Sequence, residues 1–363
     1  MYLQGIIKEE IKMDKRKVLA LVMVLVLVVG ALAACGGGSS TSTGGGDEPA
    51  GEVIKLGIGN VTTDNGKEAA RKWQELLEEA SGGTMTIEHY DDNSLGDDKA
   101  RFELCKNGDV AIVVGATGNL ASDYPDYYIY DMPYLFLNKE EVYNIGFNGV
   151  SGKKIVDGIN EHVPEVHALG MWENGFRNLT TTNTPVESPA DLGGLKIRTM
   201  DNEIHIAVWR ALGANPTPMS FNELYTALQQ GTVDGQENPI GIILGNGFHD
   251  VEKYIVYTEH VYSPYAVLIN ANLWNSFTDE QREWVQSTFD EATKYDYEVS
   301  QKIEDEADAT FEANGNVVTH LTADQKKAFQ ETAEAADALS KIQALMLHPE
   351  VAQEMVDELN AAR

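Results

Sequence analysis

Residues 53–90, VIKLGIGNVTTDNGKEAARKWQELLEEASGGTMTIEHY, determine the fold class. The segments 53–58 and 85–90 have strand-like patterns, and between them apolar residues recur at the three- and four-residue spacing of a helix. The helical positions are Ala69, Ala70, Trp73, Leu76, Leu77 and Ala80. A helix over 99–106 and a third strand over 110–114 continue the alternation. Strand, helix, strand, helix, strand predicts an α/β layer architecture with parallel pairing.

A second unit is expected to begin near residue 175. The patterns predict a strand over 195–199, helices over 204–212 and 222–230, a turn at 216–218 and a strand near 233–236. Two sequences match a capping box, SFNE at 220–223 and TDEQ at 278–281. The second opens a helix that runs to about residue 313, long enough to extend along both units. Residues 257–270 read as one strand that returns to the first unit.

Length and charge limit the class of protein. A chain of 363 residues exceeds the usual size of one core and predicts about two domains. The formal net charge of −30 disfavours nucleic acid and anionic lipid headgroups as partners, because such a surface repels them. Cys35 and Cys105 are the two cysteines, so a disulfide framework is not expected, and Cys105 is predicted to be a small buried side chain.

The N-terminus has the features of a targeting segment. Three basic residues at 15–17 precede an apolar run over 18–29, and residues 1–34 are interpreted as a secretory signal peptide. The following sequence, LAAC at 32–35, resembles the bacterial lipobox, which would make Cys35 a lipidated first residue. An ordinary secreted protein is the alternative. Residues 35–52 are rich in Gly and Ser and predict a flexible tether to a membrane.

Catalytic and cofactor motifs find little support in the sequence. The eight histidines lack the spacing of a zinc site, and neither a nucleophile elbow nor a phosphate-binding loop is present. We therefore expect no metal, no cofactor and no enzymatic activity.

Arginine is scarce after the signal segment and is more informative. Arg177 lies in GFRNL at 175–179, and Arg198 lies in LKIRT at 195–199. Two surface arginines paired with the abundant carboxylates would account for this pattern. The alternative is a guanidinium that binds a ligand carboxylate through two parallel hydrogen bonds.

A longer set of motifs favours the second interpretation. These are SLGD at 94–97, GLKIR at 194–198, LGANPTPM at 212–219 and ELYTALQQGTVDGQENP at 223–239. From about residue 53 to 345 the sequence resembles the extracytoplasmic solute-binding proteins of TRAP transporters, the DctP family. The resemblance implies a two-lobed α/β fold, periplasmic-binding-protein-like and type II-like, with crossover strands and a long hinge-spanning helix. Lobe I would comprise 53–174 plus about 264–303, and lobe II 175–263 plus about 304–363 with the C-terminal helices.

The resemblance also implies the binding residues. Arg198 matches the arginine that clamps the ligand carboxylate, and Arg177 and Asn238 match residues that assist it. Phe221 matches the aromatic residue that lines the pocket. Further candidate ligand contacts are Trp172, Thr117, Asn119 and Asp201.

The sequence is compatible with several classes of ligand. Gly59 and Ala116 stand where sialic acid-binding members carry sugar contacts, which argues against sialic acid. C4-dicarboxylates, hydroxy or keto acids and sugar acids are all compatible. The tyrosines at 127, 128, 130 and 134 are expected to pack in the core rather than to form an aromatic pocket wall.

The resulting prediction is an extracytoplasmic, lipid-anchored receptor that binds a small organic acid between two closing lobes and delivers it to TRAP permease subunits in the membrane. A ligand-sensing or scaffolding lipoprotein is the first alternative. An extracytoplasmic enzyme acting on organic or sugar acids is the second.

Overall fold

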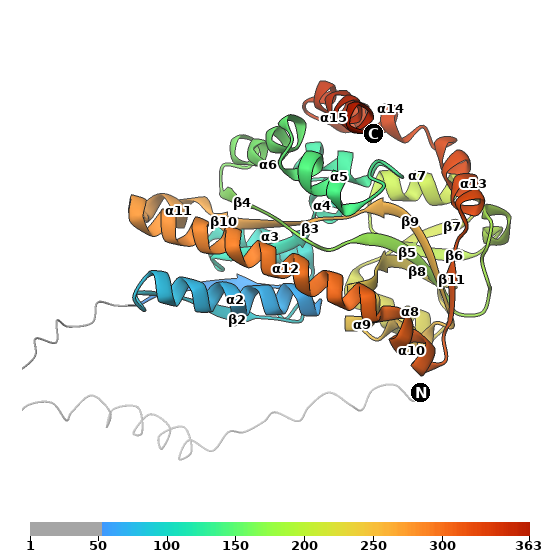
Figure 1. The fold of residues 1–363 in the computed structure, drawn as a ribbon, viewed down its shortest axis with the longest axis horizontal. Helices are drawn as coiled ribbons and strands as arrows, with labels where there is room; N and C mark the ends of the chain where they lie inside the picture. Colours follow the sequence, from blue (N-terminus) through green and yellow to red (C-terminus); the bar gives the residue numbers. More distant parts are fainter. Residues whose placement is uncertain (1–52) are drawn as a thin grey trace, which may run out of the picture. The chain divides into compact units, whose positions relative to one another are not determined.

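The structure is a computed structural model, and it describes residues 53–363. Two sheets form its centre (Figure 1). The first has the order β2-β1-β3-β10-β4, with strands β2 (Met85–Tyr90), β1 (Ile54–Gly59), β3 (Ile112–Ala116), β10 (Tyr265–Asn270) and β4 (Val166–Trp172). The second has the order β11-β9-β5-β8-β6-β7, with strands β11 (Val317–His320), β9 (Tyr254–Tyr262), β5 (Phe176–Thr181), β8 (Gly235–Pro239), β6 (Lys196–Thr199) and β7 (Asn215–Pro218).

The chain passes between the sheets where β4 leads into β5 and where β9 leads into β10. We expected one strand over 257–270, and this was wrong. The strand breaks at Ser263 and Pro264, because proline lacks the N–H that a ladder requires. The two-lobed α/β fold with crossover strands is confirmed.

The predicted long helix is α12 (Asp279–Asn314). Its capping box forms as expected: the Thr278 hydroxyl accepts from the Gln281 N–H at 3.1 Å, and the Gln281 side chain accepts from the Thr278 N–H at 2.9 Å. The helix packs against α2 (Asp64–Ala80) and β4 beside the first sheet, and against α9 (Ile240–Gly245), α10 (Phe248–Val251) and β11 beside the second. It therefore extends along both lobes (Figure 1).

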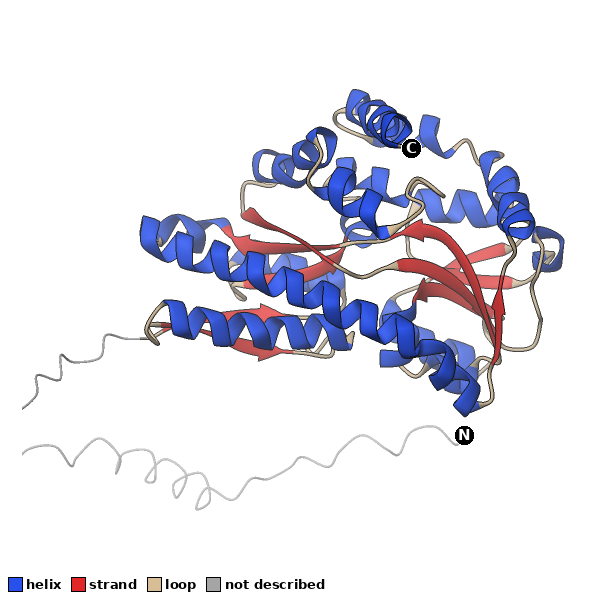
Figure 2. Cartoon of the chain, viewed as in Figure 1, coloured by secondary structure: helices blue, strands red, loops and turns tan. Residues whose placement is uncertain are grey.

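The remaining helices surround the two sheets (Figure 2). They are α3 (Asp98–Asn107), α4 (Thr117–Leu120), η1 (Pro125–Asp131), α5 (Lys139–Glu141), η2 (Val142–Phe147), α6 (Val150–His162), η3 (Pro189–Leu192), α7 (Glu203–Ala211), α8 (Phe221–Gln229), α11 (Ala271–Ser276), α13 (Ala323–Glu334), α14 (Ala338–Leu345) and α15 (Pro349–Ala362). The C-terminal helix α15 packs on α6 and η2, whereas α13 packs on α7 and β9.

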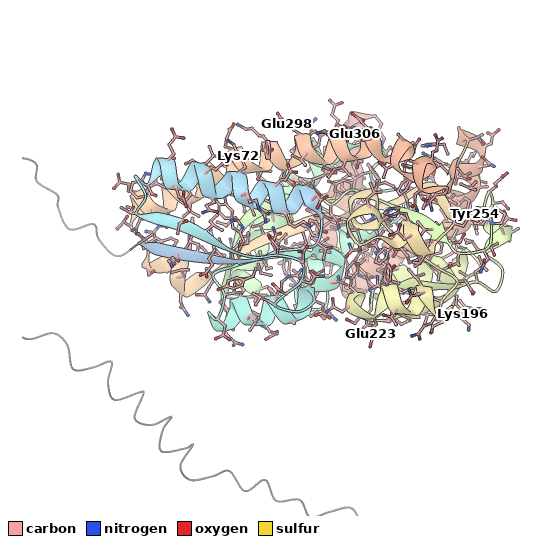
Figure 3. The ribbon with its side chains drawn as sticks, turned by 90° about the horizontal axis from the view of Figure 1, so that it is seen from below. Lys72, Lys196, Glu223, Tyr254, Glu298 and Glu306 are labelled. Atoms are coloured by element: carbon pink, nitrogen blue, oxygen red, sulfur yellow. The ribbon has the colours of Figure 1, made fainter. Side chains whose placement is uncertain are left out.

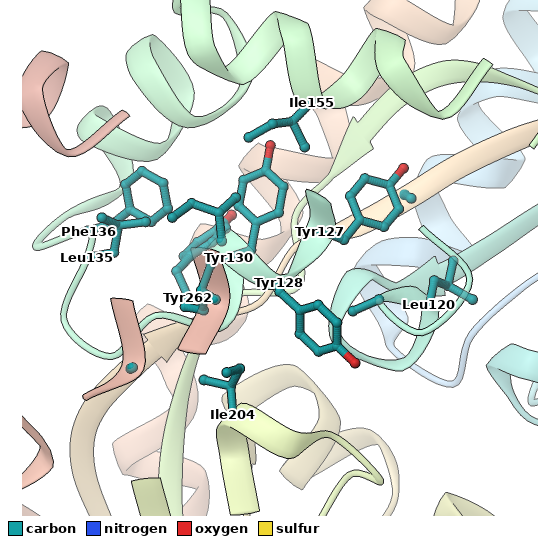
Figure 4. Packing of buried hydrophobic residues seen from close by; sticks show 14 of the residues in the cluster. Leu120, Tyr127, Tyr128, Tyr130, Leu135, Phe136, Ile155, Ile204 and Tyr262 are labelled. Carbon is teal, nitrogen blue, oxygen red and sulfur yellow. The ribbon is translucent and has the colours of Figure 1, made fainter. Parts of the chain in front are cut away.

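Both faces of the first sheet are buried, as expected for a sheet with helices on each side. Along β3, Val113 belongs to one hydrophobic cluster, while Ile112 and Val114 belong to the other. The prediction that the tyrosines pack in the core is confirmed, because Tyr127 and Tyr130 are fully buried in the first of these clusters (Figure 4). The outer surface of α12 carries exposed charged side chains, and Figure 3 labels two of them, Glu298 and Glu306.

Two local expectations in the second lobe were wrong. Residues 215–218 form β7, a strand parallel to β6, rather than a turn. The Ser220 capping box does not form, because the Ser220 hydroxyl instead donates to Asp97 Oδ2 at 3.0 Å. Asp97 is the N-cap of α3 in the other lobe, so this serine links the two lobes.

Candidate functional site

A cavity of about 220 Å³ lies between elements of the two sheets. One side is built from the segment before α3 and the end of β3. The other side is built from β6, β8 and the start of α8. The cavity is lined by Val61, Thr62, Asn93, Asp97, Asp98, Lys99, Ala116, Asn119, Asn174, Arg177, Arg198, Met200, Asp201, Met219, Ser220, Phe221, Asn238, Ile242 and Tyr265.

Arg198 is buried in the cavity wall near the end of β6, with 2% of its surface exposed. Its Nε and Nη2 donate to the Met219 carbonyl at 3.2 and 2.8 Å, and the Phe221 ring centre lies 5.8 Å from Cζ. Nη1 has no hydrogen-bond partner within residues 53–363. Burial lowers the pKa of Arg198 to about 10, so the group remains charged at neutral pH. The site thus contains a fixed guanidinium that contacts no carboxylate among the residues the structure describes.

Arg177 on β5 is paired with a carboxylate, Glu237. Its Nε donates to Glu237 Oε2 at 2.5 Å, and its Nη2 donates to Glu237 Oε1 at 2.9 Å and to Asn238 Oδ1 at 3.0 Å. Burial alone would raise the pKa of Glu237, but Arg177, His205 and His260 together outweigh this effect and hold the pKa well below the ordinary value. The charge of Arg177 is therefore balanced within the protein, unlike that of Arg198.

Glu237 is also held by two buried histidines. His260 Nε2 lies 3.0 Å from Glu237 Oε2, and His205 Nδ1 lies 3.6 Å from Oε1. The other ring nitrogen of His205 is 3.1 Å from Asp131 Oδ1. Burial lowers the pKa of His205, but hydrogen bonds to Asp131 and Glu237 outweigh it and raise the pKa to about 9. A protonated His205 thus links Asp131 of η1 to Glu237, the carboxylate that holds Arg177.

Four of the other candidate residues line the cavity: Asn238, Phe221, Asn119 and Asp201. Asn238 accepts from Arg177 and donates to Gln236 Oε1 at 2.5 Å. Asn119 donates to Asp98 Oδ2 at 2.6 Å, and Asp201 is exposed at the cavity.

Trp172 and Thr117 do not line the cavity. The Trp172 ring stacks on Phe289 of α12 with a centre distance of 5.8 Å, and its Nε1 donates to Thr293 at 3.1 Å. Thr117 is fully buried at the start of α4. Both side chains belong to the packing around the site, and the structure gives no support for their predicted contact with a ligand.

Sequence reasoning missed several lining residues, and Asn174 is the most informative. It lies in the crossing segment between β4 and β5, and 4% of its surface is exposed. Neither Nδ2 nor Oδ1 has a partner in the described part of the chain. No sequence pattern points to Asn174, because its position depends on the path of the chain between the sheets. Asp97 also lines the cavity, and its SLGD motif carries the family resemblance without indicating a ligand contact.

The remaining sequence expectations concern the N-terminal segment, metal binding and Cys105. Cys35 and the signal segment lie outside the described residues. Within residues 53–363, no cluster of His, Cys, Asp and Glu is arranged to hold a metal ion, and no helix there is long and apolar enough to cross a membrane. Cys105 is buried as predicted, and burial raises the pKa of its thiol to about 12.

Residues 59–340 match the family model of DctP, the bacterial extracellular solute-binding proteins of family 7. The chain belongs to this family. A relative in Escherichia coli K12, the 2,3-diketo-L-gulonate-binding periplasmic protein, is 32% identical over 78% of this chain and 84% of its own length. The expected resemblance to TRAP solute receptors is therefore confirmed.

Solved structures of TRAP receptors share the DctP fold. The sugar acid-binding protein of Advenella mimigardefordensis, in complex with galactonate, has a TM-score of 0.79 and 27% identity, covering 86% of this chain and 98% of that one. A TRAP periplasmic solute-binding protein of Sulfurospirillum deleyianum, with bound succinate, has a TM-score of 0.76 and 25% identity, covering 86% and 99%.

Proposed function

We propose that this DctP-family receptor binds a small organic acid in the cavity between its lobes, with the ligand carboxylate on Arg198. The carrying observation is the buried guanidinium of Arg198, whose Nη1 has no partner in residues 53–363. A buried charge is costly unless it is paired and hydrogen-bonded, and a carboxylate offers both. The carboxylates bound by solved relatives support the same class of ligand.

The proposed roles of the other residues follow from their contacts. Phe221 covers the Arg198 guanidinium, and Arg177 and Asn238 form an adjoining polar wall whose geometry Glu237 fixes. Asn119 and Asp201 face the cavity from opposite lobes. We assign no ligand contact to Trp172 or Thr117.

The receptor is proposed to bind and release its ligand unchanged. Lobe I would comprise residues 53–174 and about 264–303, and lobe II 175–263 and about 304–363, with ligand drawing them together. Closure around a bound ligand creates a distinct surface that TRAP permease subunits can recognise. Lipidation of Cys35 would hold the receptor at the outer face of the membrane.

A thermal-shift screen tests this proposal. The purified protein is unfolded and refolded to remove carried-over ligand, then mixed with monocarboxylates, dicarboxylates, sugar acids and, as a matched control, uncharged sugar alcohols. A ligand at 100 times its Kd adds about 2.7 kcal/mol to the free energy of unfolding. We expect stabilisation by at least one acid and by no sugar alcohol, with the acid recovered unchanged. Stabilisation by alcohols alone, or turnover of the acid, contradicts the proposal.

A further inference from the structure

Two side chains around the cavity combine deep burial with unpartnered polar atoms. In the part of the chain that the structure describes, these are Arg198, through Nη1, and Asn174, through both Nδ2 and Oδ1. Their exposed fractions are 2% and 4%. Buried polar groups in native proteins nearly always have partners, so two exceptions in one cavity wall indicate where a ligand supplies them.

The two groups require different chemistry. The Arg198 guanidinium can only donate, and it complements a carboxylate. The Asn174 amide has a donor and an acceptor, so its full complement is a group that both accepts and donates. A hydroxyl meets this requirement. A carboxylate would accept from Nδ2 but would leave Oδ1 facing negative charge.

The charges around the cavity further limit the ligand. Arg177 is already paired with Glu237, and Asp98 is paired with Arg101. Asp97 lines the cavity without a cation within salt-bridge distance in the described residues, and so does Asp201. Lys99 is the remaining cation, but it is exposed, and an ion pair there contributes little. A second carboxylate would therefore meet acidic side chains and, among the described residues, a buried cation that Glu237 already neutralises.

We propose that the ligand is a monocarboxylate that carries hydroxyl groups, with its carboxylate on Arg198 and a hydroxyl on the Asn174 amide. Asn174 is thus a specificity-determining residue for this receptor, and Asp97 and Asp201 select against dicarboxylates. This inference rests on the function proposed above and narrows its ligand class.

Three four-carbon acids test the inference by isothermal titration calorimetry. D-Erythronate carries one carboxylate and three hydroxyls, butanoate has the same length without hydroxyls, and succinate has a second carboxylate. We expect D-erythronate to bind at least about tenfold more tightly than either other acid. This is the gain in affinity expected when a ligand hydroxyl satisfies the donor and the acceptor of the buried Asn174 amide. This ranking uses the unaltered protein and does not depend on the folding of any variant.

The substitution Asn174→Ala then tests the residue. The Asn174 side chain makes no hydrogen bond within residues 53–363, so the thermal unfolding midpoint should change little. D-Erythronate affinity should fall about tenfold or more, while butanoate affinity stays within about twofold. Asn148→Ala is a control for affinity, because Asn148 is exposed and does not line this cavity. This control loses the hydrogen bond from Asn148 Nδ2 to the Tyr143 carbonyl, so its unfolding midpoint is measured separately.

The outcomes separate this inference from the function on which it rests. Equal or tighter binding of succinate or butanoate overturns the inference but leaves a carboxylate receptor in place. A preference for D-erythronate that survives Asn174→Ala overturns the role of Asn174. Binding of none of the three acids, together with no response in the wider screen, contradicts both proposals.

Discussion

Replacing Arg198 by methionine should weaken ligand binding by several tenfold steps without destabilising the ligand-free protein. Arg198 uses Nε and one Nη2 hydrogen to contact the Met219 carbonyl, which leaves both Nη1 hydrogens and one Nη2 hydrogen for a carboxylate. Two charge-assisted bonds at about 1.5–3 kcal/mol each amount to about 3–6 kcal/mol. Affinity should therefore fall by about 10²- to 10⁴-fold.

The stability of the same variant provides an internal control. Arg198→Met removes a buried charge that touches no carboxylate in the described chain, so the free energy of unfolding should stay within about 1 kcal/mol of the original value. Calorimetric titration with the most stabilising acid and urea unfolding measure the two effects separately. Retained affinity would refute the assignment of Arg198 as the carboxylate clamp. A loss of several kcal/mol in stability would show that the arginine serves the fold instead.

Three further predictions follow from the same contacts. Arg177→Met should cost about 3–5 kcal/mol of stability in urea unfolding, because it leaves Glu237 as a buried charge without its arginine; a loss below 1 kcal/mol would contradict the pairing. The pKa of His205 is raised to about 9, so its stabilising contribution is complete below the ordinary value near 6.5 and is lost as pH rises through 9. Unfolding free energies between pH 6.5 and 9 should consequently decline less in His205→Gln than in the unaltered protein, and equal slopes would exclude this role. Ser220→Ala removes the hydrogen bond to Asp97 across the cavity, which should raise the ligand dissociation rate about two- to fivefold in stopped-flow measurements, and an unchanged rate would show that the bond does not restrain opening.

The extent to which the sequence predicts this fold depends on how local the signals are. Thr278 and Gln281 interact within one helical turn, and their capping box forms as expected. The Ser220 box has the same local pattern but is replaced by a contact with Asp97, 123 residues away. Likewise, Pro264 divides the segment 257–270, which was expected to be one strand, and β7 forms as a strand parallel to β6.

In the candidate site, too, the sequence predicts residues that lie in contiguous motifs but not the contacts between distant residues. Arg198, Arg177, Asn238 and Phe221 are found through a resemblance that spans contiguous motifs, and all of them line the cavity. That Arg177 is neutralised by Glu237 while Arg198 is not follows only from three-dimensional contacts. Asn174 stands out because its side-chain amide has no hydrogen-bond partner within residues 53–363, and no sequence pattern indicates this.

A crystal structure of the complex with the acid that stabilises the protein most tests the central claim directly. We expect a ligand carboxylate in the cavity with an oxygen about 2.7–2.9 Å from Arg198 Nη1, the range typical of charge-assisted hydrogen bonds. A ligand whose carboxylate lies elsewhere, with Arg198 Nη1 still unpartnered, would contradict it.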